Sequence, residues 1–324
     1  MKKCTTLFIS NVNDVTTDYL ISKFESSSDD YLRINSEDIN SIAIEYNSKS
    51  GTIITRNDFS FDLSQVVSVY FRRAPTTFNS KDNVLDKPYL TNERRHFFEG
   101  LYMSLDKSKW INPIFNTYAG ERKLMQLKLA QRLKLQIPET LVTNKLEKAK
   151  EFLKAHTHCI IKPISHGLQQ RGKTFYSIYT TSIDLNKLEK LNLTDTFDTP
   201  MFLQKRIKNS KDIRVTIVGS KFFSVSIEKD SSQEVDWRKP EVAKIYKEHY
   251  LPNELEIKLA KINGYLGLVY SAIDLILTPE GEYVFLEINP VGEWGWLEKE
   301  VGLNISGSLI NELLLENHDV MSTI

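Results

Sequence analysis

The sequence has few cysteines, no excess of either charge and no long apolar run, and each of these absences excludes a class of protein. Cys4 and Cys159 are the two cysteines among 324 residues, too few for a disulfide framework and without a metal-binding spacing. We expect both to be buried free thiols in a reducing compartment. No segment approaches the roughly 20 apolar residues of a membrane span, and the apolar run near the N-terminus is too short for a signal peptide. A soluble, cytoplasmic protein with no membrane partner is the expectation.

The charges of the chain cancel, since 42 basic residues stand against 42 acidic ones. Proteins that bind polyanions usually have a basic excess, so nucleic acid is not an expected partner. The chain is long enough for a large core and for two or three lobes.

Strand-like and helix-like segments alternate in the first third of the chain, which predicts an N-terminal α/β lobe over residues 1–112. We expect a strand at 5–10, followed by a helix that Asp14 or Thr16 caps. Two apolar segments around the turn NSKSG predict a hairpin within 41–56.

Later segments continue the mixture of helices and strands. The segment 144–156 predicts a helix with Thr143 or Asn144 as its cap. Within 212–230, apolar and β-branched residues on both sides of Gly219 and Ser220 predict two strands.

The stretch HGLQQRGKTF, residues 166–175, spells G-x-x-x-x-G-K-T, the pattern of a phosphate-binding P-loop. A P-loop lysine lies at the start of a helix, where free N–H groups and the helix dipole hold phosphate. The residues from Thr174 to Thr181 are mostly β-branched or aromatic, however, and favour a strand. Because the segment HCIIKPI before the loop also predicts a strand, we reject the P-loop interpretation.

The most informative polar residues lie in two apolar segments near the C-terminal end. Asp274 lies in SAIDLIL, and Glu287 and Asn289 lie in FLEINP, with the turn TPEGE between the segments. The turn predicts an antiparallel hairpin, and the spacing places Glu287 and Asn289 on one face, where Asp274 can meet them. Two carboxylates and an amide oxygen suit Mg²⁺, which shares its coordination shell with phosphate oxygens. A solvated hairpin face is the alternative, and the apolar neighbours of these residues argue against it.

Two lysines are candidate ligands for an anion. Lys162 ends the apolar segment CIIKP, where a buried ammonium needs a negative partner. A nucleotide phosphate and a structural salt bridge satisfy that need equally well. Lys123, in GERK at the start of a helix, is a weaker candidate because most such lysines are solvated.

In their order along the chain, these motifs resemble those of ATP-grasp enzymes. The matching parts are Lys123, IIKP with Lys162, the glycine-containing loop 165–173, FLQKRI, DIRV, AIDL and LEINP, which together cover about residues 112–324. The subgroup is similar to that of the ribosomal protein S6 glutamate ligase. The motifs VYFRRAP, NPIFNTYAGERKLMQLKLA, VDWRK and INPVGEWGWLE resemble more closely the ATP-grasp macrocyclases that make microviridin-type peptides, the graspetides.

The resemblance implies an ATP-grasp fold of the α/β class with three lobes. A Rossmann-like lobe over 1–112 would precede a central lobe over 113–201 and a C-terminal lobe over 202–324 that carries the metal site. ATP would bind between the last two lobes.

The resemblance also implies a role for each matched residue. It implies ATP contacts for Lys123, Lys162, Arg171, Lys173, Gln204, Lys205, Ile207 and Asp212, two Mg²⁺ ions on Asp274, Glu287 and Asn289, and cations facing an acyl phosphate at Arg214 and Arg238. The loop 166–173 would fold over the ATP phosphates as a lid that excludes water.

Three further residues are candidates for contact with a peptide. Arg72 and Arg73 in VYFRRAP can meet an acidic peptide, but adjacent strand residues point to opposite faces, so we expect at most one of them in the site. Trp294, just beyond Asn289, lines a peptide channel in one interpretation and packs in the core in the other.

The implied reaction is ATP-dependent activation of a carboxylate through an acyl phosphate, with release of ADP and phosphate. Asp or Glu side chains of a ribosomal precursor peptide, made of a leader and a core, would then form intramolecular esters or amides with Thr, Ser or Lys side chains. The alternative is an ATP-grasp ligase that adds an amino acid to a protein or peptide terminus. A scaffold without catalysis is a third interpretation, against which the intact Asp274, Glu287 and Asn289 argue. The resemblance also allows a homodimer.

The lid interpretation makes a specific prediction about two lysines. If Lys162 binds phosphate from a strand and Lys173 lies in a hairpin loop, Lys173→Ala should lower the ATP-dependent rate less than Lys162→Ala does. The rates of the two variants, measured side by side, check this order. The reverse order would restore the P-loop interpretation.

Overall fold

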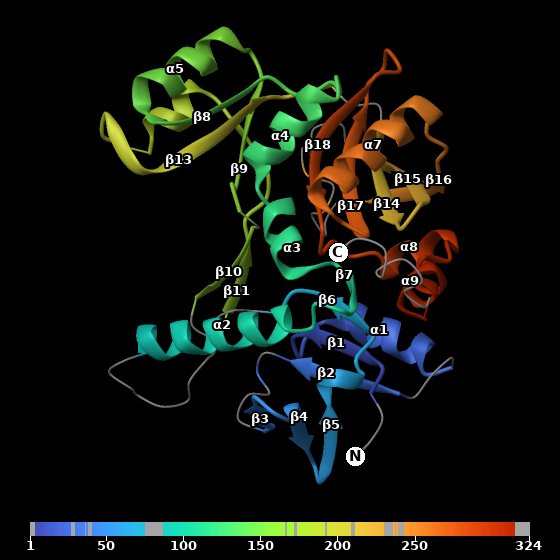
Figure 1. Ribbon diagram of the computed structural model, residues 1–324. Coiled ribbons are helices and arrows are strands. Elements are labelled where there is room, and N and C mark those ends of the chain that lie inside the picture. The colour runs from blue at the N-terminus through green and yellow to red at the C-terminus, as the bar shows by residue number, and fades with distance from the viewer. Residues whose placement is uncertain are drawn as a thin grey trace.

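The structure is a computed structural model. It describes residues 4–26, 30–35, 37, 41–74, 87–165, 167–171, 174–191, 193–208, 211–229, 236, 238 and 243–314. The larger sheets have four, four and five strands, and Figure 1 shows them in separate lobes: the N-terminal lobe at the bottom, the central lobe at the upper left and the C-terminal lobe at the upper right. The α/β class expected from the sequence is confirmed.

A parallel sheet in the order β2-β1-β6-β7 forms the N-terminal lobe. Its strands are β1 (Thr6–Ser10), β2 (Tyr31–Asn35), β6 (Ser68–Phe71) and β7 (Lys109–Ile111). The predicted hairpin is present as β3 (Ala43–Asn47) and β4 (Gly51–Arg56), which β5 (Phe59–Asp62) and a short 3₁₀ turn, η2 (Leu63–Gln65), follow.

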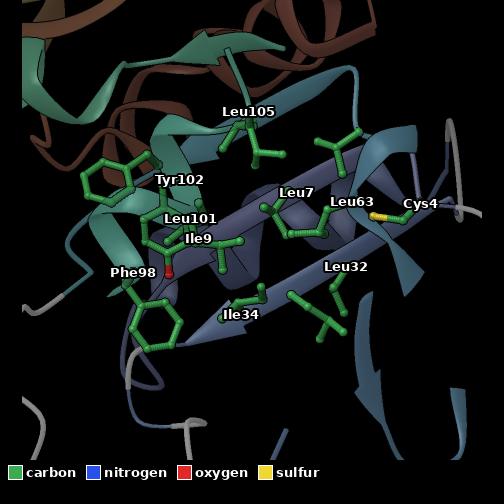
Figure 2. Close-up of a cluster of buried hydrophobic side chains, with 14 of the residues drawn as sticks. Cys4, Leu7, Ile9, Leu32, Ile34, Leu63, Phe98, Leu101, Tyr102 and Leu105 are labelled. Atoms are coloured by element: carbon green, nitrogen blue, oxygen red, sulfur yellow. The ribbon is translucent and has the colours of Figure 1, made fainter. Parts of the chain in front are cut away.

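Both faces of the parallel sheet are buried, as the unbroken apolar sequence of β1 requires. Leu7 and Ile9 point to one face, where they pack with side chains of α2 (Lys87–Met103), including Phe98 and Leu101 (Figure 2). Phe8 points to the other face and meets Phe24 of α1 (Val15–Phe24) at a ring-centroid distance of 5.3 Å. The alternation of side chains along one strand therefore separates two cores.

The second of these cores joins the N-terminal lobe to the end of the chain. Trp294 lies in it, fully buried, with Phe8, Tyr70 and Tyr270. The helices α8 (Gly295–Val301) and α9 (Ile305–Leu314) contribute further apolar side chains, as does α1. The N-terminal lobe is thus packed against the segment that directly follows the candidate metal residues.

The central lobe contains an antiparallel sheet in the order β12-β9-β13-β8. Its strands are β8 (Thr140–Lys145), β9 (Cys159–Lys162), β12 (Thr181–Ile183) and β13 (Thr196–Lys205), covered by α5 (Leu146–Ala155) and α6 (Leu185–Glu189). A separate hairpin consists of β10 (Leu168–Arg171) and β11 (Thr174–Ser177). Strands therefore lie on both sides of Gly172 and Lys173, which excludes a helix-bound P-loop there.

One capping prediction in this lobe is wrong. Strand β8 runs to Lys145, so Lys145 rather than Thr143 or Asn144 is the N-cap of α5, and no side chain caps this helix. The Thr143 hydroxyl instead accepts a hydrogen bond from the backbone N–H of Lys145 at 3.0 Å. By contrast, Asp14 caps α1 by accepting from the N–H groups of Thr16 and Thr17, so Asp14 rather than Thr16 is the cap.

The C-terminal lobe contains an antiparallel sheet in the order β16-β15-β14-β17-β18. Its strands are β14 (Lys211–Val218), β15 (Lys221–Lys229), β16 (Lys244–Glu248), β17 (Tyr270–Leu277) and β18 (Tyr283–Asn289). Residues of α4 (Lys123–Arg132) and α7 (Asn253–Leu266) share one apolar core with this sheet, and α3 (Ile114–Gly120) precedes α4. The two strands predicted within 212–230 are present as β14 and β15, which pair antiparallel, and the predicted antiparallel pair β17–β18 is confirmed.

Each expected lobe contains one of these sheets, and β13 runs across the expected boundary at residue 201. The lobe boundaries at 112 and 201 stay predictions. Cys4 and Cys159 are buried free thiols, as expected. Among the described residues, no helix is long and apolar enough to cross a membrane.

The ion pair between Asp14 and Arg72 yields a stability prediction, because both side chains are almost fully buried. Asp14→Asn leaves the guanidinium of Arg72 buried without a counter-charge, which should lower the free energy of unfolding by about 3–5 kcal/mol. The double variant Asp14→Asn/Arg72→Met should be more stable than Asp14→Asn alone, because it buries no uncompensated charge. Denaturant unfolding measures both; equal stabilities of the single and double variants would contradict the pairing.

Candidate active site

Three charged side chains form a row across the C-terminal sheet. The register of β14, β17 and β18 places Arg214 opposite Asp274 and Asp274 opposite Glu287. Their neighbours along the strands, such as Ile213 and Ile273, lie in the apolar core on the other face, because side chains alternate. Asp274 and Glu287 line a cleft between the central and C-terminal lobes.

A β-bulge in β18 directs two consecutive residues toward this cleft. Asp274 pairs with Glu287, whereas Leu275 pairs with Phe285, so Leu286 is the extra residue of the bulge. Leu286 and Glu287 both line the cleft, although adjacent residues of a regular strand would face opposite ways. Bulges commonly redirect a side chain in this manner next to active sites.

Arg214 holds Asp274 in a fixed orientation. The guanidinium Nη1 donates to both carboxylate oxygens of Asp274 at 2.9 Å. Burial raises the pKa of Asp274, the charge of Glu287 raises it further, and Arg214 opposes both effects. The carboxylate therefore depends on a positive neighbour to remain ionised.

Glu287 is paired with a cation from a helix. Lys123 Nζ, at the first residue of α4, lies 2.8 Å from Glu287 Oε2. Burial alone would raise the pKa of Glu287, but the charges of Lys123, Lys162 and Arg238 outweigh this effect and lower the pKa to about 2. Glu287 is consequently a carboxylate at any physiological pH.

The side chain of Gln126 sets the position of α4 against β18. Its Nε2 donates to the carbonyl of Ile288 at 2.8 Å, and its Oε1 accepts from the N–H of Ile288 at 3.1 Å. The buried amide thus takes the place of a neighbouring strand at the edge of the sheet. Because Lys123 lies one turn before Gln126 and Glu287 lies next to Ile288, the same contact brings Lys123 to Glu287.

Lys162 faces these carboxylates from the central lobe. It lies at the end of β9, opposite Phe202 of β13, and its Nζ is 5.0 Å from the centre of the Phe202 ring. Burial lowers the pKa of Lys162 to about 8, and the nearby charges of Lys123 and Arg238 act in the same direction. The Lys162 ammonium is therefore costly to keep charged without an anionic partner.

Residues from both lobes line the cleft. The lining residues are Pro138, Ile160, Lys162, Thr180, Gln204, Lys205, Arg206, Ile207, Asp212, Asp236, Arg238, Asp274, Ile276, Leu286 and Glu287. Ile160 of the central lobe and Ile276 and Leu286 of the C-terminal lobe supply apolar surface. The segment 204–207, where β13 ends, connects the two lobes along one wall.

Two more acidic residues of the cleft are paired with cations. Asp212 Oδ2 lies 2.8 Å from Nζ of Lys229, and burial raises the pKa of Asp212 while Lys229 opposes the shift. Asp236 accepts two hydrogen bonds from the guanidinium of Arg238 and one from the N–H of Thr180. Asp236 is buried, whereas the Arg238 side chain is 48% exposed and lines the cleft.

Asn289 lies two residues beyond Glu287 and pairs with Ala272 of β17. Its Oδ1 accepts a hydrogen bond from the N–H of Val291 at 3.0 Å, which fixes the amide at the end of the strand. Asp274, Glu287 and Asn289 therefore lie on neighbouring positions of two paired strands, as the hairpin pattern predicts.

The three peptide-contact candidates lie outside this cleft. Arg72 is 1% exposed and contacts Asp14, and Trp294 is fully buried, so both positions favour packing over contact with a peptide. Arg73 is partly exposed and lies 2.8 Å from Glu293, beside the segment that follows Asn289. The two adjacent arginines are thus in different environments, as their neighbouring positions in sequence suggest.

The lid candidates are only partly within the described residues. Arg171 is the last residue of β10, in the hairpin whose strands flank the loop. Lys173 lies outside the described residues. Strand β11 (Thr174–Ser177) begins directly after Lys173, which agrees with the expectation of a strand rather than a helix there.

The oxygen ligands that Asp274, Glu287 and Asn289 offer fit a hard cation such as Mg²⁺. Asp274 and Glu287 are buried carboxylates on paired strands, and Asn289 adds an amide oxygen. Within the described residues, no three His, Cys, Asp or Glu side chains gather into a metal-binding group, so the ligand set includes the amide of Asn289.

Sequence reasoning missed Gln126, Lys229 and Asp236. The hairpin β14–β15 contains a signal for Lys229, because its register places Ile227 opposite Asp212 and Lys229 on the diagonal. Gln126 follows Lys123 by three residues on the buried face of α4, where a polar side chain needs a partner. No pattern in the sequence indicates that Asp236 is buried.

Comparisons with known proteins agree with this geometry. Residues 123–276 match the family model of the prokaryotic glutathione synthetase ATP-grasp domain. No curated protein matches the sequence.

Solved structures match nearly the whole chain. The macrocyclase MdnC from Microcystis aeruginosa MRC, bound with precursor peptide MdnA, is 27% identical with a TM-score of 0.82 over 95% of this chain and 99% of that chain. Macrocyclase MdnB from the same organism is 28% identical with a TM-score of 0.78, covering 96% and 99%. A RiPP-associated ATP-grasp ligase from Chryseobacterium gregarium shares the fold at 24% identity, with a TM-score of 0.82 and 96% of both chains covered.

The cleft, the paired carboxylates on β17 and β18 and these similarities lead to one conclusion. The chain has the ATP-grasp fold and is an ATP-grasp ligase similar to the graspetide macrocyclases.

Proposed function

We propose that the protein uses ATP to close rings within a ribosomally made precursor peptide. Asp or Glu side chains of the core would be activated as acyl phosphates and then joined to Thr, Ser or Lys side chains, with release of ADP and phosphate. The observation that carries the proposal is the row Arg214–Asp274–Glu287, which faces Lys162 across the cleft. The similarity to macrocyclases over almost the full chain supports a peptide as the substrate.

The inner part of the cleft suits the nucleobase of ATP. Ile160 and Leu286 offer apolar surfaces for its faces, and the segment 204–207 offers hydrogen-bonding groups for its edge. The N–H groups of Lys205 and Arg206 already donate to the carbonyls of Glu139 and His158, each at 2.9 Å. The N–H of Ile207 is therefore our candidate donor to the base.

The two lysines near Glu287 suit the phosphates of ATP. Lys123 and Lys162 come from different elements and both lie near Glu287, as their effects on its pKa show. An incoming phosphate would take over the ammonium of Lys123 from Glu287, which frees that carboxylate for other partners. Asp212 lines the same cleft and would face the ribose and phosphates, and Arg171 and Lys173 would cover them from the hairpin loop.

Asp274, Glu287 and Asn289 would hold Mg²⁺, and we expect two ions. When bound, Mg²⁺ neutralises charge on the β- and γ-phosphates during phosphoryl transfer. Arg214 orients Asp274 for this purpose through its two hydrogen bonds. The fixed amide of Asn289 and the low pKa of Glu287 keep the other two ligands ready in the required form.

The chemistry begins when a substrate carboxylate attacks the γ-phosphorus of ATP, and ADP leaves. Arg214 and Arg238 would stabilise the resulting acyl phosphate, since Asp274 and Asp236 hold their guanidinium groups in place. A hydroxyl or amine of the same peptide then attacks the acyl carbon, loses its proton and displaces phosphate. Because both groups belong to one bound peptide, ring closure has the advantage of proximity.

The expected partner and cellular compartment follow from this reaction. The substrate would be a peptide with a leader for recognition and a core for cyclisation, and Arg73 and Glu293 lie where an exposed peptide could reach them. The buried free thiols agree with a reducing cytoplasm. A homodimer remains part of the proposal.

Mass spectrometry tests the reaction directly. The protein, ATP, Mg²⁺ and a Thr/Ser- and Asp/Glu-rich peptide encoded beside its gene should yield a product that has lost one water mass per ring. Asp274→Asn and Glu287→Gln should each lower the rate by about 100-fold or more, because charge stabilisation at the phosphates is lost.

Glu282→Gln is the matched control, since Glu282 is an exposed carboxylate in the turn of the same hairpin and outside the cleft. It should cyclise the peptide at the normal rate. A mass gain in place of the water loss would support the intermolecular ligase instead. Full activity of Asp274→Asn would contradict the assignment of the site.

The pKa of Lys162 predicts a pH dependence of nucleotide binding. Phosphate binds the protonated ammonium, and burial lowers the pKa of Lys162 in the free protein to about 8. The affinity for ADP without Mg²⁺ should therefore fall as the pH rises through about 8, and binding near this pH should take up protons. Calorimetry in two buffers of different ionisation enthalpy measures both effects.

Lys162→Arg is the control for this titration, because a guanidinium stays charged throughout the range. The variant should show no proton uptake and an affinity that changes little between pH 7 and pH 9. If wild type and variant show the same pH profile, another group is responsible for the dependence.

A further inference from the structure

Thr140 and Gln204 form a hydrogen-bonded pair, and Gln204 is one of the residues that line the cleft. They lie opposite each other on β8 and β13. The hydroxyl of Thr140 donates to the carbonyl of Pro138 at 2.7 Å, and Nε2 of Gln204 donates to the hydroxyl oxygen of Thr140 at 2.8 Å. The hydroxyl has a single proton, so while it donates to Pro138 it can only accept from Gln204.

This chain of hydrogen bonds decides which end of the Gln204 amide faces the cleft. With Nε2 directed at Thr140, the carbonyl oxygen Oε1 points away from Thr140. The Gln204 side chain is fully buried and lines the cleft, and within the described part of the chain its Oε1 has no hydrogen-bond partner. A buried acceptor without a donor is costly, and such an atom in a cleft indicates a ligand that donates to it.

We infer that Thr140 is a positioning residue that makes the cleft select purines with a 6-amino group over purines with a 6-oxo group. Gln204 Oε1 accepts a hydrogen bond from the exocyclic amine of the former, whereas the oxygen of the latter meets Oε1 as a second acceptor. The inference deepens the proposed function, because it rests on the nucleotide site of that proposal and is independent of the peptide. The orientation of the Gln204 amide would select the base, and the hydroxyl of Thr140 would fix that orientation.

Loss of the Thr140 hydroxyl would permit the opposite orientation of the Gln204 amide. Asn and Gln amides present a donor at one end and an acceptor at the other. Without the hydroxyl of Thr140 as an acceptor, the NH₂ group loses its partner and the amide is free to turn its donor toward the cleft. A 6-oxo purine would then be accepted, so the selectivity would decrease without any change in the size of the cleft.

Binding of two nucleoside diphosphates tests the inference on the full chain, with no peptide present. ADP and inosine diphosphate differ only at the 6-position and in the protonation of N1. Calorimetry should show that wild type binds ADP more tightly. In Thr140→Val, which preserves the shape of the side chain, the affinity ratio of ADP to inosine diphosphate should fall by about tenfold, the loss typical of one buried hydrogen bond. If the valine variant folds poorly, Thr140→Ala can replace it. This variant removes the same oxygen and should give the same fall in the affinity ratio.

Two further variants distinguish a positioning role of Thr140 from a role in the stability of the fold alone. Thr140→Ser restores the hydroxyl and should restore the wild-type ratio. Adding Gln204→Glu to Thr140→Val should also restore a preference for ADP, because a carboxylate presents an acceptor in either orientation. A purely structural role of Thr140 would change the melting temperature and both affinities together, and would leave their ratio unchanged.

The outcomes distinguish this inference from the proposed function. An unchanged ratio in Thr140→Val and Thr140→Ala, with ADP still bound, overturns the inference. If wild type binds ADP selectively and the ratio falls as stated while no peptide is cyclised, the inference stands and the proposed function fails. A wild-type protein that binds neither nucleotide overturns the inference together with the nucleotide site.

Discussion

The compensation of buried charge in the cleft is the constraint on which the rest of the structure depends. Asp274 is paired with Arg214, Glu287 with Lys123, and Asp212 with Lys229. Each of these carboxylates costs several kcal/mol to bury unless a cation is held close to it. The cations come from a neighbouring strand, a helix and a hairpin, so all of these elements must be in place before the charged face of the sheet is stable.

The same requirement links the lobes. Gln126 attaches α4 to the edge of β18 and so brings Lys123 to Glu287. Beyond Asn289, the chain turns at once into the core of the N-terminal lobe, where Trp294 is fully buried. The candidate metal residues are therefore held from both sides. The central lobe, which lies beside the C-terminal lobe in Figure 1, carries Lys162 on the other wall of the cleft. In the proposed mechanism, such a site would bind its ligand by exchanging internal ion pairs for new ones.

Local patterns in the sequence predicted much of this arrangement. A turn between two apolar segments and a spacing of two residues were sufficient to place Asp274, Glu287 and Asn289 on one face of a hairpin, because side chains alternate along a strand. The β-branched residues after Lys173 predicted a strand, and β11 is there. Where the prediction of a cap failed, at Thr143 and Asn144, strand pairing with β13 extended β8 to Lys145 and moved the start of the helix.

The sequence by itself determined the elements, their apolar faces and the kinds of donor at the site, since all of these depend on neighbours within a few residues. Only the tertiary structure decided which cation meets which carboxylate, that Arg72 is buried against Asp14, and that the Gln204 amide donates to Thr140. Those contacts join residues far apart in the chain, Lys123 and Glu287 being one example. They follow from the packing of whole elements and the free energy of burying charge, which no short window of sequence contains.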